Sequence, residues 1–180
     1  MQRSAWTPWS AAGADNAPVL IRAATDDDWP LIWPFYRAIV AAGETYAIDP
    51  AIPEQQARRQ WMQAPPGCTF VAVADDGAVV GSASAYPNRP ARGSHVASAS
   101  FMVDPARAGG GVGRALGEHV IAWAREQGFR AMQFNAVVAT NERAVALWES
   151  LGFVTLASVP EAFEHPTHGL VGLLIMHRFL

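Results

Sequence analysis

The sequence predicts an α/β domain of the α+β type, with about seven strands and four helices. Two observations favour this class. Strand-like apolar segments and amphipathic helical segments follow one another in the order β-α-α-β-β-β-α-β-α-β-β. The 180 residues are 51% apolar, which suits one compact core. Since no repeat, low-complexity tract or linker divides the chain, we expect a single domain over 18–180 after an irregular extension over 1–17.

The N-terminal half is expected to form one strand, two helices and a β-hairpin. Three aspartates at 26–28 place capping oxygens and negative charge where a helix start favours them. The turn sequence at 75–77, Asp-Asp-Gly, tolerates positive φ and predicts the hairpin. The expected ranges are 18–25 for the strand, 25–43 and 53–62 for the helices, and 69–74 and 78–86 for the hairpin strands.

The C-terminal half is expected to alternate strands and helices. Its first strand leads through Asp104 and Pro105 into a glycine-rich loop that opens a helix. Gly128 and Gly152 stop the two helices, because glycine readily adopts the left-handed conformation of a helix C-terminus. The expected ranges are 95–103, 132–138, 153–159 and 170–179 for the strands, and 112–127 and 141–151 for the helices.

The composition argues against several classes of protein. Lys and Arg number 13 against 16 Asp and Glu, so the net charge of −3 attracts neither nucleic acid nor an anionic membrane. Cys68 is the only cysteine, which excludes an internal disulfide and fits a reducing compartment. No basic leader with an apolar core and no stretch of about 18 apolar residues is present. We expect a cytoplasmic protein with no nucleic-acid or membrane partner.

The glycine-rich loop predicts an anion site. Four glycines fall at 109–113, between a strand and an amphipathic helix, where unpaired N–H groups meet no Cβ. A flexible turn is the alternative. Arg114 and Ala115 stand where a P-loop needs Lys and Ser or Thr, and Leu116 stands where a dinucleotide fingerprint needs its third glycine. The pyrophosphate of coenzyme A remains as the favoured ligand.

At this point the chain resembles the GNAT superfamily of N-acetyltransferases. One motif is the glycine-rich helix start after the fourth strand, and the second is an asparagine followed by A-x-x-L-Y-x-x-x-G-F, found here over 141–153 with Trp at the Tyr position. The resemblance covers 19–180. It implies a splayed central sheet with antiparallel and parallel strand pairs, and acetyl-CoA as co-substrate.

The resemblance also implies site residues. The fourth strand would offer backbone groups to the pantetheine and the acetyl carbonyl, with an N–H near Met102 polarising that carbonyl. The cofactor-binding residues implied are Phe101, Met102, Val103, Arg107, Gly109, Gly110, Gly111, Val112, Gly113, Arg114, Asn141, Ala144 and Trp148.

Two positions depart from the family pattern. Ala108 stands where the family has Arg or Gln, so a phosphate contact is missing or comes from Arg107 or Arg114. Trp148 stands where many members carry a tyrosine that protonates the departing thiolate, and an indole N–H is no practical acid. Trp148 either packs in the core or lines the thiol end of the cofactor channel.

The acyl acceptor is expected at the fifth strand. Strand alternation places Gln133, Asn135 and Val137 on one face, and Asn135 would hydrogen-bond the carboxylate or amide of a small acceptor. An asparagine satisfied by nearby backbone is the alternative. The segment at 133–135, followed by Asn141, also resembles the proline-analogue N-acetyltransferases, in which such an asparagine is assigned to the substrate.

The expected reaction is direct attack of a neutral amine on the thioester, without a covalent intermediate. Glu44 and His165 are candidate bases, since both lie in loops that could border an acceptor pocket. His165 and His168 have a possible metal spacing but lack further ligands, so no metal is expected. The favoured acceptor is a small-molecule amine, an amino acid or analogue; a peptide or protein amine and a catalytically inactive coenzyme A sensor are the alternatives. A homodimer is expected from the exposed C-terminal strands.

Overall fold

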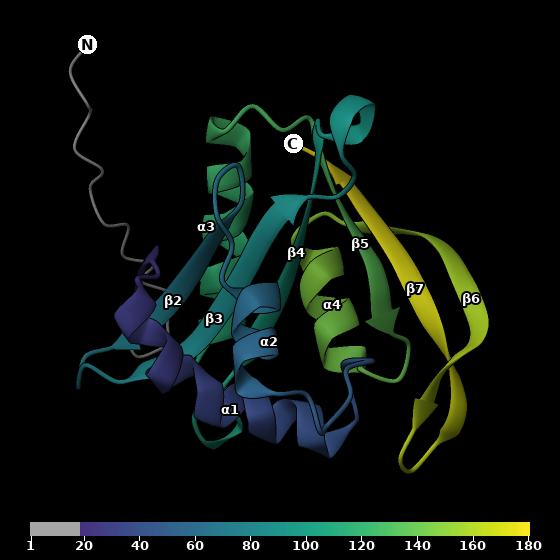
Figure 1. Cartoon of the computed structure of the whole chain (residues 1–180). Helices are drawn as coiled ribbons and strands as arrows, with labels where there is room; N and C mark the ends of the chain where they lie inside the picture. Colours follow the sequence, from purple (N-terminus) through teal and green to yellow (C-terminus); the bar gives the residue numbers. More distant parts are fainter. Residues whose placement is uncertain (1–18) are drawn as a thin grey trace.

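The computed structural model describes residues 19–180, which form one seven-stranded mixed sheet and four α-helices (Figure 1). This confirms the expected fold class. The extension expected over 1–17 lies outside the described residues. The strands are β1 (Val19–Ala23), β2 (Cys68–Ala74), β3 (Val79–Pro87), β4 (Val96–Val103), β5 (Ala131–Val138), β6 (Val154–His165) and β7 (Gly169–Phe179). The α-helices are α1 (Trp29–Ala42), α2 (Glu54–Trp61), α3 (Val112–Glu126) and α4 (Glu142–Ser150).

The order of strands across the sheet is β1-β2-β3-β4-β5-β7-β6. Neighbouring strands are antiparallel except β4 and β5, which are parallel. A parallel neighbour requires a crossover, and α3 supplies it between β4 and β5. The parallel pair therefore divides the sheet into an N-terminal and a C-terminal half.

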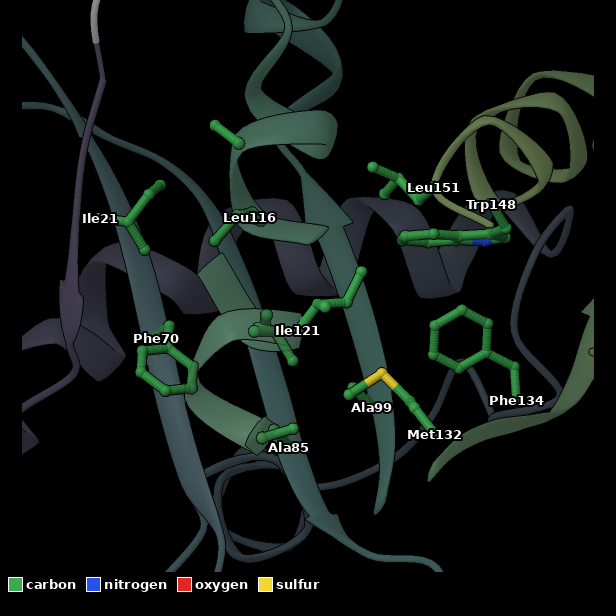
Figure 2. Close-up of a cluster of buried hydrophobic side chains, with 14 of the residues drawn as sticks. Ile21, Phe70, Ala85, Ala99, Leu116, Ile121, Met132, Phe134, Trp148 and Leu151 are labelled. Atoms are coloured by element: carbon green, nitrogen blue, oxygen red, sulfur yellow. The ribbon is translucent and has the colours of Figure 1, made fainter. Parts of the chain in front are cut away.

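Each face of the N-terminal half carries its own apolar core. Alternate residues of β2 show this, since Phe70 belongs to the core that includes α3 and α4, while Val71 belongs to the core that includes α1 and α2. Figure 2 shows the first core, in which Leu116 and Ile121 of α3 lie near Ile21 and Phe70 of the sheet. The two cores hold the sheet between two helical layers.

Two differences from the expected elements have physical reasons. The helix α1 begins at Trp29, because Asp26–Asp28 form a 3₁₀ turn before it. Strand β6 continues to His165 instead of ending at 159, and it makes a long hairpin with β7 (Figure 1). Pro160 does not end β6, because an edge strand has one side free of ladder hydrogen bonds.

Candidate active site

The centre of the site is the place where β4 and β5 separate. The two strands pair only through Val96 with Ala131 and Ala97 with Met132 within the described chain. Beyond these pairs a cavity of about 410 Å³ opens between the strands. Its walls come from β4, β5, the loop after α1, and one face of α4, and they include Tyr46, Phe101, Met102, Val103, Asn135, Asn141, Ala144 and Trp148.

The register of β3 and β4 determines which backbone groups reach this cavity. The N–H of Asp104 donates to the Val80 carbonyl, and the N–H of Asn88 donates to the Val96 carbonyl, so the even-numbered residues of β4 bond to β3. Phe101 is odd-numbered and turns its N–H and C=O toward β5. Near Met102, the backbone N–H that faces the cavity is therefore that of Phe101, while the Met102 N–H is directed toward β3.

Tyr46, from the loop after α1, reaches those same backbone groups. Its hydroxyl donates to the Phe101 carbonyl at 2.7 Å and accepts from the Phe101 N–H at 3.0 Å. Burial raises the pKa of the Tyr46 phenol above its ordinary value, so the hydroxyl stays protonated. The sequence analysis did not assign Tyr46 a role, because a tyrosine in an irregular loop carries no pattern that points to a strand 55 residues away.

The glycine-rich loop lies at the end of β4 beside α4. Gly109 and Gly111 have φ of +108° and +73°, values that favour glycine, and Gly111 is the N-cap of α3. No side chain of the described residues caps this helix. A Cβ on Gly113 would lie 3.8 Å from Val103, which places the helix start next to the cavity wall. Unsatisfied N–H groups at a helix start are suited to a phosphate.

Both arginines of this region have partners. Arg107 forms an ion pair of 2.9 Å with Asp76 in the turn between β2 and β3. Arg114 donates to the Ser150 hydroxyl at 2.8 Å and lies 3.6 Å from Glu118. Neither guanidinium is buried, so a phosphate could exchange with these partners. Their contact with the cofactor stays a prediction.

One face of α4 forms a wall of the cavity, through Asn141, Ala144 and Trp148. The Asn141 side chain caps α4 by accepting from the Ala144 N–H at 3.1 Å. Trp148 is only 6% exposed and contacts Phe101 and Phe134, with ring centroids 4.7 and 4.8 Å away (Figure 2). Trp148 is thus both a core aromatic and a residue of the cavity wall, so the two readings are compatible.

Asn135 lines the cavity in a polar cluster. It accepts from the Gln133 amide at 2.8 Å and donates to the Asn88 side chain at 2.7 Å. The expectation that Val137 shares its face is wrong, because a bulge sets Asn135 and Ala136 opposite a single residue of β7. Val137 instead packs with the core on the α3 and α4 side. Sequence analysis missed Asn88, which lies 47 residues away in a loop.

The structure does not bring the two candidate bases to the cavity wall. Glu44 is exposed, although its neighbours Thr45 and Tyr46 line the cavity. His165 is buried at the end of β6, where its Nδ1 accepts from the Thr167 N–H at 3.2 Å. Their role as bases remains a prediction.

A second cavity of about 510 Å³ adjoins the first and shares Tyr46, Tyr86 and Ser100 with it. Tyr36, Trp61 and Ser84 belong to the second cavity alone. Across 19–180, neither cavity is lined by an arginine, lysine or carboxylate. Both are therefore lined by apolar groups, amides and hydroxyls.

A strand pair that separates over a cavity, followed by a glycine-rich helix start, defines a site of the coenzyme A-dependent acyltransferase class. The model of the acetyltransferase (GNAT) family matches residues 29–153. The chain belongs to this family, as its sequence motifs predicted. The enzymes of the family are N-acyltransferases.

Individual relatives agree with this membership. A GCN5-related N-acetyltransferase from Kribbella flavida is 60% identical, with a TM-score of 0.88 over 90% of this chain and 98% of that one. The structure of yncA from Salmonella typhimurium with its cofactor acetyl-CoA is 26% identical, with a TM-score of 0.76 over 90% and 94% of the chains. The N-acetyltransferase aca1 of Schizosaccharomyces pombe is 37% identical over 42% of this chain. The match covers only 36% of the length of that relative.

The described helices include none that is long and apolar enough to cross a membrane. Within 19–180, no three His, Cys, Asp or Glu side chains gather into a group that could hold a metal ion.

Proposed function

We propose that this protein transfers an acetyl group from acetyl-CoA to the amine of a small molecule by direct attack. The observation that carries the proposal is the cavity between the diverging β4 and β5, with the uncapped start of α3 at its end. The cavity can hold an extended chain along β4, and the helix start can hold a pyrophosphate. Binding of acetyl-CoA by a 26% identical relative of the same fold supports this assignment.

The residues of the chain supply position and polarity. The Phe101 N–H on the open side of β4 is suited to donate to an acyl carbonyl oxygen, where negative charge develops as the amine attacks. The aromatic wall of Trp148, Phe101 and Phe134 excludes water from one side of the cavity. Bound acetyl-CoA supplies the activated acyl group. Catalysis then rests mainly on holding the two reactants together.

The acceptor is proposed to lie against Asn135. The Asn135 amide is exposed toward the cavity and is held by Asn88 and Gln133, so its orientation is determined before an acceptor arrives. Amides and hydroxyls can hydrogen-bond neutral polar groups. They can also bind a carboxylate, but only through hydrogen bonds and without an opposite charge. An amino acid or an analogue fits this lining, and its neutral amide derivative should fit as well.

Release of thiol from acetyl-CoA with a panel of amines tests the proposal. The panel should pair each amino acid with its amide and with the amine that lacks the carboxyl group. Acceptor-dependent thiol release is expected. Asn135→Ala should raise the acceptor KM or lower kcat, while the affinity for acetyl-CoA, measured by calorimetry, changes little. An equal loss of acetyl-CoA affinity would remove Asn135 from the acceptor site.

A coenzyme A sensor without catalysis is the second candidate. Trp148 favours it, because the indole takes the place of the family's tyrosine acid and is packed among Phe101, Phe134 and Phe153. The two candidates differ in one result. Tight binding of acetyl-CoA with no thiol release above the rate without acceptor, across the whole panel, would favour the sensor.

A further inference from the structure

Tyr46 is a cavity residue to which the resemblance to the family gives no role. The backbone N–H and C=O of Phe101 point toward β5, but β5 does not pair with them, because the pairing of β4 with β5 ends at Ala97. In its place the Tyr46 hydroxyl bonds both the N–H and the C=O of Phe101, at 3.0 and 2.7 Å. One side chain thus satisfies the two strand groups at the centre of the cavity.

The Tyr46 oxygen accepts the same hydrogen bond that an acyl carbonyl oxygen would accept. A hydrogen-bond acceptor lies about 2.9 Å from a backbone nitrogen. An acyl oxygen that accepts from the Phe101 N–H would therefore occupy the space that the Tyr46 oxygen now fills. The two oxygens cannot both take this position. Binding of a thioester at Phe101 therefore requires the Tyr46 hydroxyl to leave.

We propose that Tyr46 is a built-in occupant of the acyl-carbonyl position, which acetyl-CoA displaces and free coenzyme A does not. The proposal rests on the proposed function, because it takes Phe101 as the donor to the acyl group. A free thiol carries no carbonyl oxygen and is a weak acceptor, so coenzyme A has nothing to exchange for the Tyr46 bond. Tyr46 thereby lowers the preference of the site for the acylated cofactor over the free one.

The surroundings of Tyr46 allow this exchange. Tyr46 lies in the loop between α1 and α2, where its ring packs edge-on against Trp61 at 6.4 Å. It also lines both cavities, so its side chain lies at the boundary between them. A change of the Tyr46 side chain to another χ1 rotamer would carry the hydroxyl away from Phe101 without unfolding the loop.

The test compares Tyr46→Phe with Tyr36→Phe. Tyr36 is the matched control, because it is a buried tyrosine that lines only the second cavity. Binding of acetyl-CoA and of free coenzyme A is measured by calorimetry. Tyr46→Phe should tighten acetyl-CoA about two- to tenfold, the usual range for one net hydrogen bond, and leave coenzyme A unchanged. Tyr36→Phe should change neither.

Hydrogen exchange of the Phe101 amide gives a readout that is independent of cofactor chemistry. In the protein alone, Tyr46→Phe should speed this exchange, because the amide loses its acceptor. Acetyl-CoA should protect the amide again in the variant. Unchanged or weaker acetyl-CoA binding by Tyr46→Phe would overturn the inference while the proposed function stands. If the wild-type protein binds no acetyl-CoA, both are overturned.

Discussion

Asp28 joins β1 to α1, and its charge should contribute about 2 kcal/mol to the free energy of unfolding. The carboxylate accepts two hydrogen bonds of 2.7 Å from the Arg22 guanidinium and one of 2.7 Å from the Thr25 N–H. The Arg22 hydrogen bonds are the largest cause that lowers the pKa of Asp28 from 3.8 to about 2, against the opposing effect of burial. The difference between these pKa values corresponds to about 2 kcal/mol, at about 1.36 kcal/mol for each pH unit.

The sign follows from a carboxyl pKa that is lower in the folded state. The stabilisation is fully present above the unfolded pKa of 3.8 and is lost as the pH falls through about 2. Asp28→Asn should therefore lose about 2 kcal/mol at pH 7 in urea denaturation followed by tryptophan fluorescence. The difference in the free energy of unfolding between the variant and the wild type should shrink between pH 4 and pH 2. Taking this difference cancels the effect of the other carboxylates, which titrate in both proteins.

Asp26→Asn is the matched control. Asp26 is also paired with an arginine, Arg58, at 2.7 Å, but its side chain is 88% exposed. Exposed ion pairs contribute little, so this variant should stay near wild type. Equal losses in the two variants, or a loss in Asp28→Asn that does not change with pH, would refute the reasoning.

Three further predictions concern the site and the core beside it. Gly110→Ala should weaken acetyl-CoA binding without lowering stability, because no described atom lies within 4 Å of an added Cβ in the free protein. Gly81→Ala should do the reverse and cost about 1–3 kcal/mol, because its Cβ would lie 3.0 Å from Val112 and 3.1 Å from the Met102 carbonyl. Calorimetry and urea denaturation measure both, and a Gly110→Ala protein that binds normally would contradict the phosphate cradle. Trp148→Ala should cost about 3–5 kcal/mol in urea denaturation, because the indole is 6% exposed among three phenylalanines. A loss below about 1 kcal/mol would show that the wall is not part of the core.

The cofactor half of the candidate site could be predicted because its signals are local in the chain. The glycine-rich loop has positive φ at Gly109 and Gly111, a conformation that only glycine adopts without strain. The run of glycines in the sequence therefore indicates the backbone conformation of the loop. The second motif is contiguous as well, and Asn141 caps the helix that it opens. Spacing along one helix then places Ala144 and Trp148 on the cavity wall.

The acceptor half could be predicted only in part, because it depends on contacts between distant segments. Asn135 was predicted from its place in an apolar strand and does line the cavity, but the bulge after Phe134 changed which neighbours share its face. Asn88 and Tyr46 come from loops that only the folded chain brings to β5 and β4. Glu44 and His165 do not line the cavity, which the sequence could not show, since loop residues carry no periodicity that indicates which way they point. Their role as bases remains a prediction.

The sequence alone determined the fold class, the family and the place of the glycine-rich helix start, because strand and helix periods and glycine conformations are properties of neighbouring residues. Only the tertiary structure decided that Phe101 turns its backbone groups to the cavity in place of Met102. That choice depends on hydrogen-bond register, and a shift of one residue reverses it. It also decided that the Tyr46 hydroxyl lies on those groups, a contact between residues 55 positions apart.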